Sequence, residues 1–146
     1  MIYLLYGQPG SGKTSLGKLL ASHLDTPFII DGDEFREMFT NTNYGKDGRE
    51  ENIRNANAVA TYLNKKSRNS TNGHVVVSLV NPYKHLRDEL RENNTGQVVE
   101  ILLHSNRELR KKYHVEDFEE GAPCAEMNTD DSVKRSWIKL KGKLGI

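Results

Sequence analysis

The chain has 146 residues, the length of one ordinary domain, and leaves no room for two. Its 21 Lys and Arg residues nearly balance 20 Asp and Glu residues, and the net charge of +1 argues against a dedicated nucleic-acid binder. A single cysteine rules out an internal disulfide and an all-cysteine zinc site, and no apolar run approaches the ~18 residues of a membrane span. We therefore expect one domain over residues 1–146, in a reducing cytoplasm, with neither nucleic acid nor a membrane as partner.

Short apolar runs alternate with segments of helical periodicity along the chain. The expected strands are residues 2–6, 27–31, 74–80, 97–104 and, with a weaker pattern, 124–128. The expected helices are residues 13–24, 34–39, 49–66, 84–92, 107–113 and 131–144, the last with Ser132 as its N-cap. This alternation predicts an α/β fold in which a parallel five-stranded sheet carries helices on both faces. In such a sheet, ligands bind at the carboxyl ends of the strands.

Residues 7–14, directly after the first expected strand, read GQPGSGKT and match the phosphate-binding loop pattern G-x-x-x-x-G-K-[ST]. Glycines let backbone N–H groups curl around phosphate oxygens, and the following helix directs its partly positive end at the same anion. We expect Lys13 to bridge the β- and γ-phosphates as a catalytic residue, and Thr14 to bind Mg²⁺. The alternative is a chance glycine turn between a strand and a helix. The residues expected to bind ATP are Gly7, Gln8, Pro9, Gly10, Ser11, Gly12, Lys13, Thr14 and Ser15.

Two carboxylates, Asp31 and Asp33, flank a glycine at the end of the second expected strand. Phosphoryl transfer needs carboxylates at this place, both to hold Mg²⁺, usually through water, and to accept the proton of the acceptor hydroxyl. We therefore expect both aspartates to be catalytic, with Asp31 holding the metal through water. The alternative is structural, with Asp33 capping a helix that begins at Glu34 and Asp31 stabilising the turn.

Polar residues on the next two expected helices predict the binding of an anionic acceptor. Arg36 lies about one helical turn after Asp33 and faces the same way. Arg49, Asn52 and Ile53 share one helix face, so two hydrogen-bond donors lie beside an apolar contact, which suits a phosphate or sulfate with a base nearby. For all of these residues the alternative is a charged, solvated helix surface.

In order and spacing, these segments together resemble adenylylsulfate kinases. The resemblance is carried by the phosphate loop, D-G-D-x-x-R at 31–36, R-x-E-N-I-R at 49–54 and N-P-Y at 81–83. It covers about residues 1–104 and returns at 125–130. It implies a three-layer P-loop kinase fold. It also implies transfer of the γ-phosphate of Mg-ATP to the ribose 3′-hydroxyl of adenosine 5′-phosphosulfate.

The resemblance further implies roles for individual residues. Asp33 would act as the base or as a water-mediated metal holder beside the 3′-hydroxyl. The phosphosulfate end of the acceptor would be bound by arginine and asparagine side chains, and its adenine would lie against the backbone around residue 81. Phe39 either stacks on that base or packs in the core. The expected acceptor-binding residues are Asp33, Arg36, Phe39, Arg49, Asn52, Ile53, Val80, Asn81 and Pro82.

Three departures from the family pattern bear on the acceptor. Asn81 stands where the family usually has a serine, so no phosphoserine can form and direct in-line transfer is the expected route. The loop at 43–45 is about one residue shorter, and the lid, about residues 111–123, is truncated and acidic. Two alternatives stay open: a kinase of another small hydroxyl compound, nucleotide or polynucleotide end, and a nucleotide-binding protein without chemistry. The expected partner is a small-molecule nucleotide substrate, and a homodimer is left open.

Overall fold

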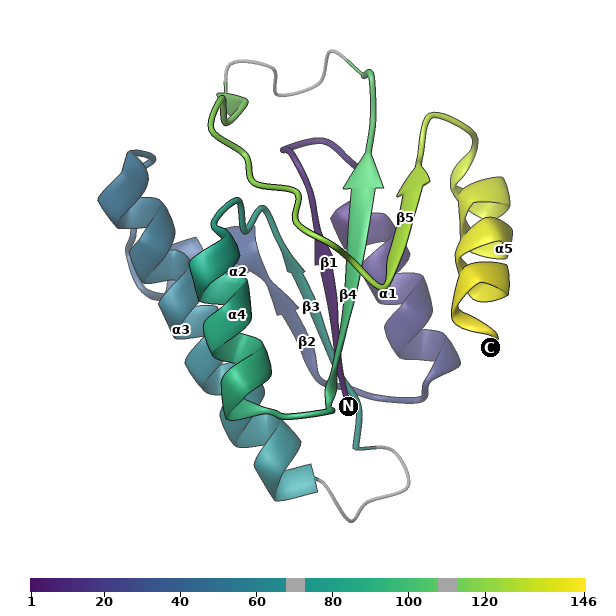
Figure 1. Ribbon diagram of the computed structural model, residues 1–146, viewed down its shortest axis with the longest axis horizontal. Helices are drawn as coiled ribbons and strands as arrows, with labels where there is room; N and C mark the ends of the chain where they lie inside the picture. Colours follow the sequence, from purple (N-terminus) through teal and green to yellow (C-terminus); the bar gives the residue numbers. More distant parts are fainter. Residues whose placement is uncertain (68–72, 108–112) are drawn as a thin grey trace.

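The computed structural model describes residues 1–67, 73–107 and 113–146. Its strands are β1 (Ile2–Tyr6), β2 (Ile29–Asp31), β3 (Val75–Leu79), β4 (Val98–His104) and β5 (Ala125–Asn128). They form one sheet in the order β2-β3-β1-β4-β5, and every pair is parallel (Figure 1). The helices of the described ranges are α1 (Lys13–His23), α2 (Gly32–Met38), α3 (Lys46–Ser67), α4 (Lys84–Asn93) and α5 (Val133–Leu144). The predicted α/β fold with a parallel five-stranded sheet is confirmed.

Two apolar cores, one on each face of the sheet, produce the three layers. Successive strand residues point to opposite faces, so Leu4 packs in the core that contains Ile53 of α3 and side chains of α2 and α4. Its neighbour Leu5 packs in the other core, with Leu16 of α1 and Leu140 of α5. Figure 1 shows the same division, with α3 and α4 on one side of the strands and α1 and α5 on the other. The predicted covering of both faces is confirmed.

The register of the sheet brings three strand ends to one edge. Tyr6, the last residue of β1, pairs with Leu79 of β3 and Leu102 of β4, and Asp31 of β2 pairs with Ser78. The phosphate loop therefore leaves the sheet beside the segments that follow β2 and β3. All five residues of β3 are buried, as expected for an interior strand with helices on both sides.

The start of α2 differs from the expectation because Asp31 is its N-cap. Asp31 Oδ1 accepts a 2.9 Å hydrogen bond from the Asp33 backbone N–H, and the helix begins at Gly32 rather than at residue 34. The capping role considered for Asp33 is therefore wrong, because the residue before the helix supplies the acceptor.

Two further helix boundaries can be compared with the expectations. Helix α3 begins at Lys46 instead of residue 49, and Asp47 in its first turn complements the positive end of the helix. Ser132 caps α5 as predicted, since its hydroxyl accepts a 3.2 Å hydrogen bond from the Arg135 N–H. The helix expected at 107–113 falls mostly on residues 108–112, outside the described ranges, and Arg107 belongs to no helix. Among the described helices, none has the length and apolarity that crossing a membrane requires.

Candidate active site

The phosphate loop lies between the end of β1 and the start of α1, as its sequence predicts. Gly7 is required because the backbone of β4 passes very close to it: a Cβ at this position would lie 2.4 Å from the Leu103 carbonyl oxygen. Helix α1 begins at Lys13, so its free N–H groups face the loop. The Lys13 ammonium curls back over the loop and donates to Gln8 O at 2.8 Å and to Ser11 Oγ at 3.2 Å. The ammonium is thus held against the phosphate loop itself.

Thr14 and Asp31, the two residues expected to hold Mg²⁺, are in direct contact. The Thr14 hydroxyl donates to Asp31 Oδ2 at 2.7 Å, while Asp31 Oδ1 accepts from the Asp33 N–H. Asp31 is buried, so both of its oxygens are held in fixed directions at the end of β2. A hydroxyl and a carboxylate are the hard oxygen ligands that Mg²⁺ prefers, directly or through water. The residues present therefore fit the metal.

A cleft of about 970 Å³ opens above this edge of the sheet. It brings together most of the residues singled out in the sequence. The cleft is lined by Pro9, Gly10, Gly12, Lys13, Thr14, Ser15, Asp31, Asp33, Arg36, Arg49, Asn52, Ile53, Val80, Asn81 and Pro82. Gly7, Gln8 and Ser11 belong to the loop but do not line the cleft. Phe39 does not line it either: its side chain is 47% exposed and its ring lies against Phe35, with centroids 5.6 Å apart.

Arg36 and Arg49 are both held in place by the loop that joins α2 to α3. Arg36 Nη1 donates to Asn43 O at 3.0 Å, and its guanidinium lies over the Tyr44 ring, 4.2 Å from the centroid. Arg49 donates to Tyr44 O at 2.7 Å and to the Tyr83 hydroxyl at 2.9 Å. Burial lowers the pKa of the Arg36 guanidinium, partly offset by the nearby Tyr44 and Asp33. Both guanidinium groups line the cleft, and two positioned guanidinium groups have the charge and the donors that an anion requires.

Two buried amides, Asn81 after β3 and Asn52 of α3, also line the cleft. Asn81 has a left-handed backbone, with φ of 45°, and is 0% exposed. In the part of the chain that the structure describes, neither atom of its carboxamide has a hydrogen-bond partner, and the same holds for Asn52 Oδ1. Asn52 Nδ2 donates to Gly32 O at 3.2 Å. Each unpaired buried polar group costs about 1–3 kcal/mol, so these amides are retained at a cost in stability.

Several residues of the cleft were not expected from the sequence. Tyr44 and Tyr113, far apart in the chain, form a tilted ring pair at 5.3 Å, and both line the cleft. Arg107 donates to Thr129 Oγ1 at 3.3 Å, and Thr129 Oγ1 donates in turn to Ser11 O at 2.7 Å. The position of Arg107, just after β4, was a signal that the strand-end rule could have used. Nothing local in the sequence marks the tyrosine pair.

Residues 113–121, which make up most of the expected lid, form a segment that we call the strap. It runs beside the phosphate loop: the Gln8 side chain donates to Val115 O at 2.7 Å and accepts from the Val115 N–H at 2.9 Å. This two-point contact explains why Gln8 does not line the cleft. Lid residues 111 and 112 lie outside the described ranges.

The fold and the phosphate loop define a nucleotide-binding protein of the P-loop kinase type. The chain belongs to the adenylylsulphate kinase family, which matches residues 1–122. Among solved structures it is similar to the APS kinase CysC of Mycobacterium tuberculosis, in complex with AMPPNP and APS: 20% identity, TM-score 0.78, covering 99% of this chain and 97% of that one. It is also similar to a gluconokinase from Sinorhizobium meliloti 1021, with 20% identity and a TM-score of 0.74, over 98% of this chain and 90% of that one.

Two curated relatives match over shorter stretches. A cytidylate kinase from Pyrobaculum arsenaticum is 24% identical over 120 residues, covering 77% of this chain and 65% of that protein. The ATP-dependent zinc metalloprotease FtsH of Aquifex aeolicus is 54% identical over 37 residues, which is 25% of this chain and 6% of that protein. The chain thus spans less than two thirds of each of these relatives.

Proposed function

We propose that this protein transfers the γ-phosphate of ATP to the ribose 3′-hydroxyl of adenosine 5′-phosphosulfate, in the presence of Mg²⁺. One observation carries the proposal: a single cleft is lined by the phosphate loop with its Thr14–Asp31 pair and by an acceptor wall that includes Arg36 and Arg49. Phosphoryl transfer depends mainly on holding donor and acceptor in line and on neutralising charge, which such a cleft can do. Membership of the adenylylsulphate kinase family supports the choice of acceptor.

On the donor side, Lys13 and the backbone N–H groups of the loop would bind the β- and γ-phosphates. Both the ammonium and the start of α1 act on the charge that develops as the phosphoryl group moves. Thr14 and, through water, Asp31 would hold Mg²⁺, because they present hard oxygen ligands at the same end of the loop. When bound, the ion neutralises charge on the phosphate oxygens.

On the acceptor side, the hydroxyl oxygen would attack the γ-phosphorus while the bond from that phosphorus to the β,γ-bridging oxygen breaks, and ADP leaves. Asp33, which lines the cleft, would orient the hydroxyl and take its proton. Arg36 and Arg49 would bind the phosphosulfate end. The Tyr44 and Tyr113 rings offer flat apolar faces to the adenine, a role expected of Phe39, which lies outside the cleft lining.

A second candidate keeps the reaction and changes the acceptor to a sugar acid or another small hydroxyl compound. It is favoured by the TM-score to a gluconokinase, 0.74, which is close to the 0.78 found for the APS kinase CysC. The position of Phe39 outside the lining favours it as well, since an acceptor without a base does not need that ring. A homodimer stays open for either candidate.

A direct experiment separates these candidates. The purified protein is mixed with ATP and Mg²⁺, and ADP release is measured without acceptor and with adenosine 5′-phosphosulfate, gluconate or CMP in parallel. We expect release to depend on adenosine 5′-phosphosulfate, and the product to carry a 3′-phosphate by mass spectrometry. Release that depends on gluconate or CMP instead would overturn the acceptor assignment. ATP binding without turnover on any acceptor would identify a nucleotide-binding protein without chemistry.

A further inference from the structure

Arg87 of α4 is a buried cation with an unusual set of partners. Its side chain is 2% exposed, yet no ion pair joins it to a carboxylate anywhere in residues 1–67, 73–107 and 113–146. Its guanidinium donates instead to two backbone carbonyls, Asn81 O at 2.7 Å and Glu119 O at 2.5 Å, and lies over the Tyr6 ring, 4.4 Å from the centroid. A buried charge is costly unless it is hydrogen-bonded. These contacts compensate the cost only while both carbonyls stay in place.

The first carbonyl belongs to Asn81, which lines the same cleft as Arg36 and Arg49. These three residues are taken together as the acceptor wall. Asn81 follows β3 with a left-handed φ of 45°, and this turn sends the chain into Pro82 and then α4. A left-handed backbone is unfavourable for an L-residue, although Asn adopts it more readily than most, so contacts that hold this turn matter. The Arg87 hydrogen bond to its carbonyl is such a contact. Arg87 lies about one helical turn into α4, so this hydrogen bond joins the start of the helix to the turn at Asn81.

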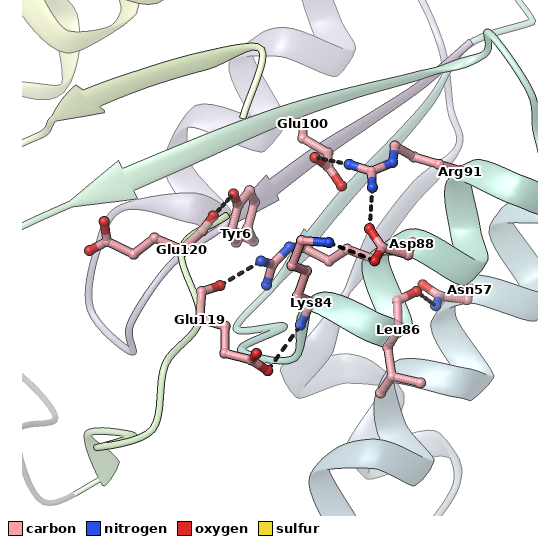
Figure 2. Close-up of polar contacts among 10 residues, drawn as sticks. Tyr6, Asn57, Lys84, Leu86, Asp88, Arg91, Glu100, Glu119 and Glu120 are labelled. Carbon is pink, nitrogen blue, oxygen red and sulfur yellow. Dashed lines mark hydrogen bonds and ion pairs between the residues drawn. The ribbon is translucent and has the colours of Figure 1, made fainter. Parts of the chain in front are cut away.

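The second carbonyl belongs to the strap. Glu119 also binds the segment between β3 and α4. The Glu119 N–H donates to Pro82 O at 2.9 Å, and the Glu119 side chain accepts from the N–H of Lys84 at 3.3 Å. One residue on, Glu120 O accepts a 2.5 Å hydrogen bond from the Tyr6 hydroxyl. Figure 2 shows the Glu120 backbone directed at the Tyr6 hydroxyl and the Glu119 carboxylate directed at Lys84, where α4 begins.

The packing leaves little freedom at this junction. Tyr6 stacks on Phe118 of the strap, with ring centroids 6.2 Å apart and an interplanar angle of 4°. On the other side, a Cβ at Gly121 would lie 3.0 Å from Arg87 Nη2, so the strap backbone passes directly against the guanidinium. The cation is therefore enclosed by the Tyr6 ring, the strap and the turn after β3.

We propose that Arg87 is a positioning residue that joins the strap to the Asn81 turn and so holds the acceptor wall of the cleft in its working shape. The strap contacts both halves of the site: Val115 is bonded to Gln8 of the phosphate loop, and Glu119 is bonded to the corner that carries Asn81. Loss of Arg87 should release the acceptor end of the strap and leave its phosphate-loop end bonded. The kinetic part of this inference rests on the proposed phosphoryl transfer, whereas the part that concerns the strap does not.

The first test follows hydrogen exchange in the protein without ligands, in Arg87→Met, Arg87→Lys and the control Lys84→Met. Lys84 lies on the same helix, but its side chain pairs with Asp88 and does not contact the strap. In Arg87→Met we expect the Glu119 amide to exchange at least about tenfold faster, because the Glu119 carbonyl loses a hydrogen bond from a charged donor, one of the stronger kinds in proteins. The Val115 amide should change much less. In Arg87→Lys, whose ammonium can bind one of the two carbonyls, the exchange rate at Glu119 should lie between those of Arg87→Met and the wild type. The control Lys84→Met should match the wild type.

The second test measures the Michaelis constants for both substrates. We expect Arg87→Met to raise KM for adenosine 5′-phosphosulfate about tenfold or more while KM for ATP changes less than about twofold, with partial recovery in Arg87→Lys. Unchanged exchange at Glu119 in a folded Arg87→Met or Arg87→Lys would overturn the inference. An equal rise in KM for both substrates would overturn it as well, because it would indicate a general structural role for Arg87. If the wild type turns over no acceptor, the proposed function fails, and the exchange at Glu119 and Val115 still decides whether Arg87 holds the strap.

Discussion

The Thr14 hydroxyl donates a 2.7 Å hydrogen bond to Asp31 Oδ2, although the two residues are 17 positions apart in the chain. The same carboxylate caps α2 through its other oxygen, which accepts from the Asp33 N–H at 2.9 Å. Asp31 therefore has two roles at once: it begins a helix and holds the hydroxyl expected to bind the metal. These two roles can be separated by substitution.

Asp31→Asn should weaken the use of Mg²⁺ and spare the fold. Asn caps helices about as well as Asp, so we expect the free energy of unfolding to change by less than about 0.5 kcal/mol. Loss of the charge should raise the Mg²⁺ concentration for half-maximal activity about tenfold or more, the effect typical of groups that support a metal site. Denaturant unfolding and a Mg²⁺ titration of the rate would check both parts. An unchanged Mg²⁺ requirement would remove Asp31 from the metal site.

Lys13→Ala should slow transfer by about 10²–10³-fold, since it removes a positioned cation from the developing charge of the phosphoryl group. Single-turnover measurements at saturating ATP would isolate this effect from binding. Lys18→Ala is the matched control, because Lys18 is an exposed lysine of the same helix that does not line the cleft. Transfer at the wild-type rate in Lys13→Ala would be incompatible with the proposed role of the phosphate loop.

Gly7→Ala should destabilise the protein, because its Cβ would lie 2.4 Å from Leu103 O and 2.8 Å from Ser11 Oγ. Relieving such overlap typically costs about 1–3 kcal/mol, and the shift of the loop should lower affinity for ATP as well. Gly142→Ala is a control of opposite sign: a Cβ there meets nothing within 4 Å in α5. It should stabilise the protein by about 0.5–1 kcal/mol, the usual gain of Ala over Gly in a helix. Urea unfolding of the two variants against the wild type would give both signs.

Tyr6 should make the stability of the protein depend on pH in the alkaline range. Burial, only partly offset by the nearby Arg87, raises the pKa of Tyr6 from its usual 10.0 to about 12. The neutral phenol is therefore favoured in the folded state. Its contribution is complete below pH 10 and is lost as pH rises from 10 towards 12, because the unfolded chain releases the proton first.

Tyr6→Phe provides the comparison for this effect. The free energy of unfolding of the wild type should fall more steeply between pH 10 and 12 than that of the variant, by the slope of a single proton. The difference between the two curves, measured by urea unfolding, removes the contribution of every other titrating group. Parallel curves would contradict a raised pKa for this phenol.

Much of the fold and of the donor half of the site could be predicted from the sequence. The features that made this possible depend on residues close together in the chain. They are strand runs such as residues 2–6 and 75–77, the glycine-rich loop, and Asp31 at the end of a strand. Their consequences follow from backbone geometry and from the rule that parallel strands end at one edge. The expected start of α2 was wrong by two residues, because the Asp31 carboxylate accepts from the Asp33 N–H and so begins the helix at Gly32.

The acceptor half was predicted less well because its parts meet only in space. Phe39 shared a helix with Arg36 in the expectation, yet its ring lies against Phe35 and does not line the cleft. Tyr44 and Tyr113 pair across 69 positions of sequence, which no periodicity reveals. A ring pair of this kind needs tertiary packing to bring its members together.

By itself, the sequence determined that this chain has a parallel sheet with a phosphate loop at its edge, because those features depend on local pattern and on short-range backbone preference. Only the tertiary structure decided how the acceptor wall is held. The left-handed turn at Asn81 and the strap carbonyl at Glu119 converge on the Arg87 guanidinium. The reason is physical: a buried cation with carbonyl partners is stable only when segments distant in sequence enclose it together, and no single segment shows that it will do so.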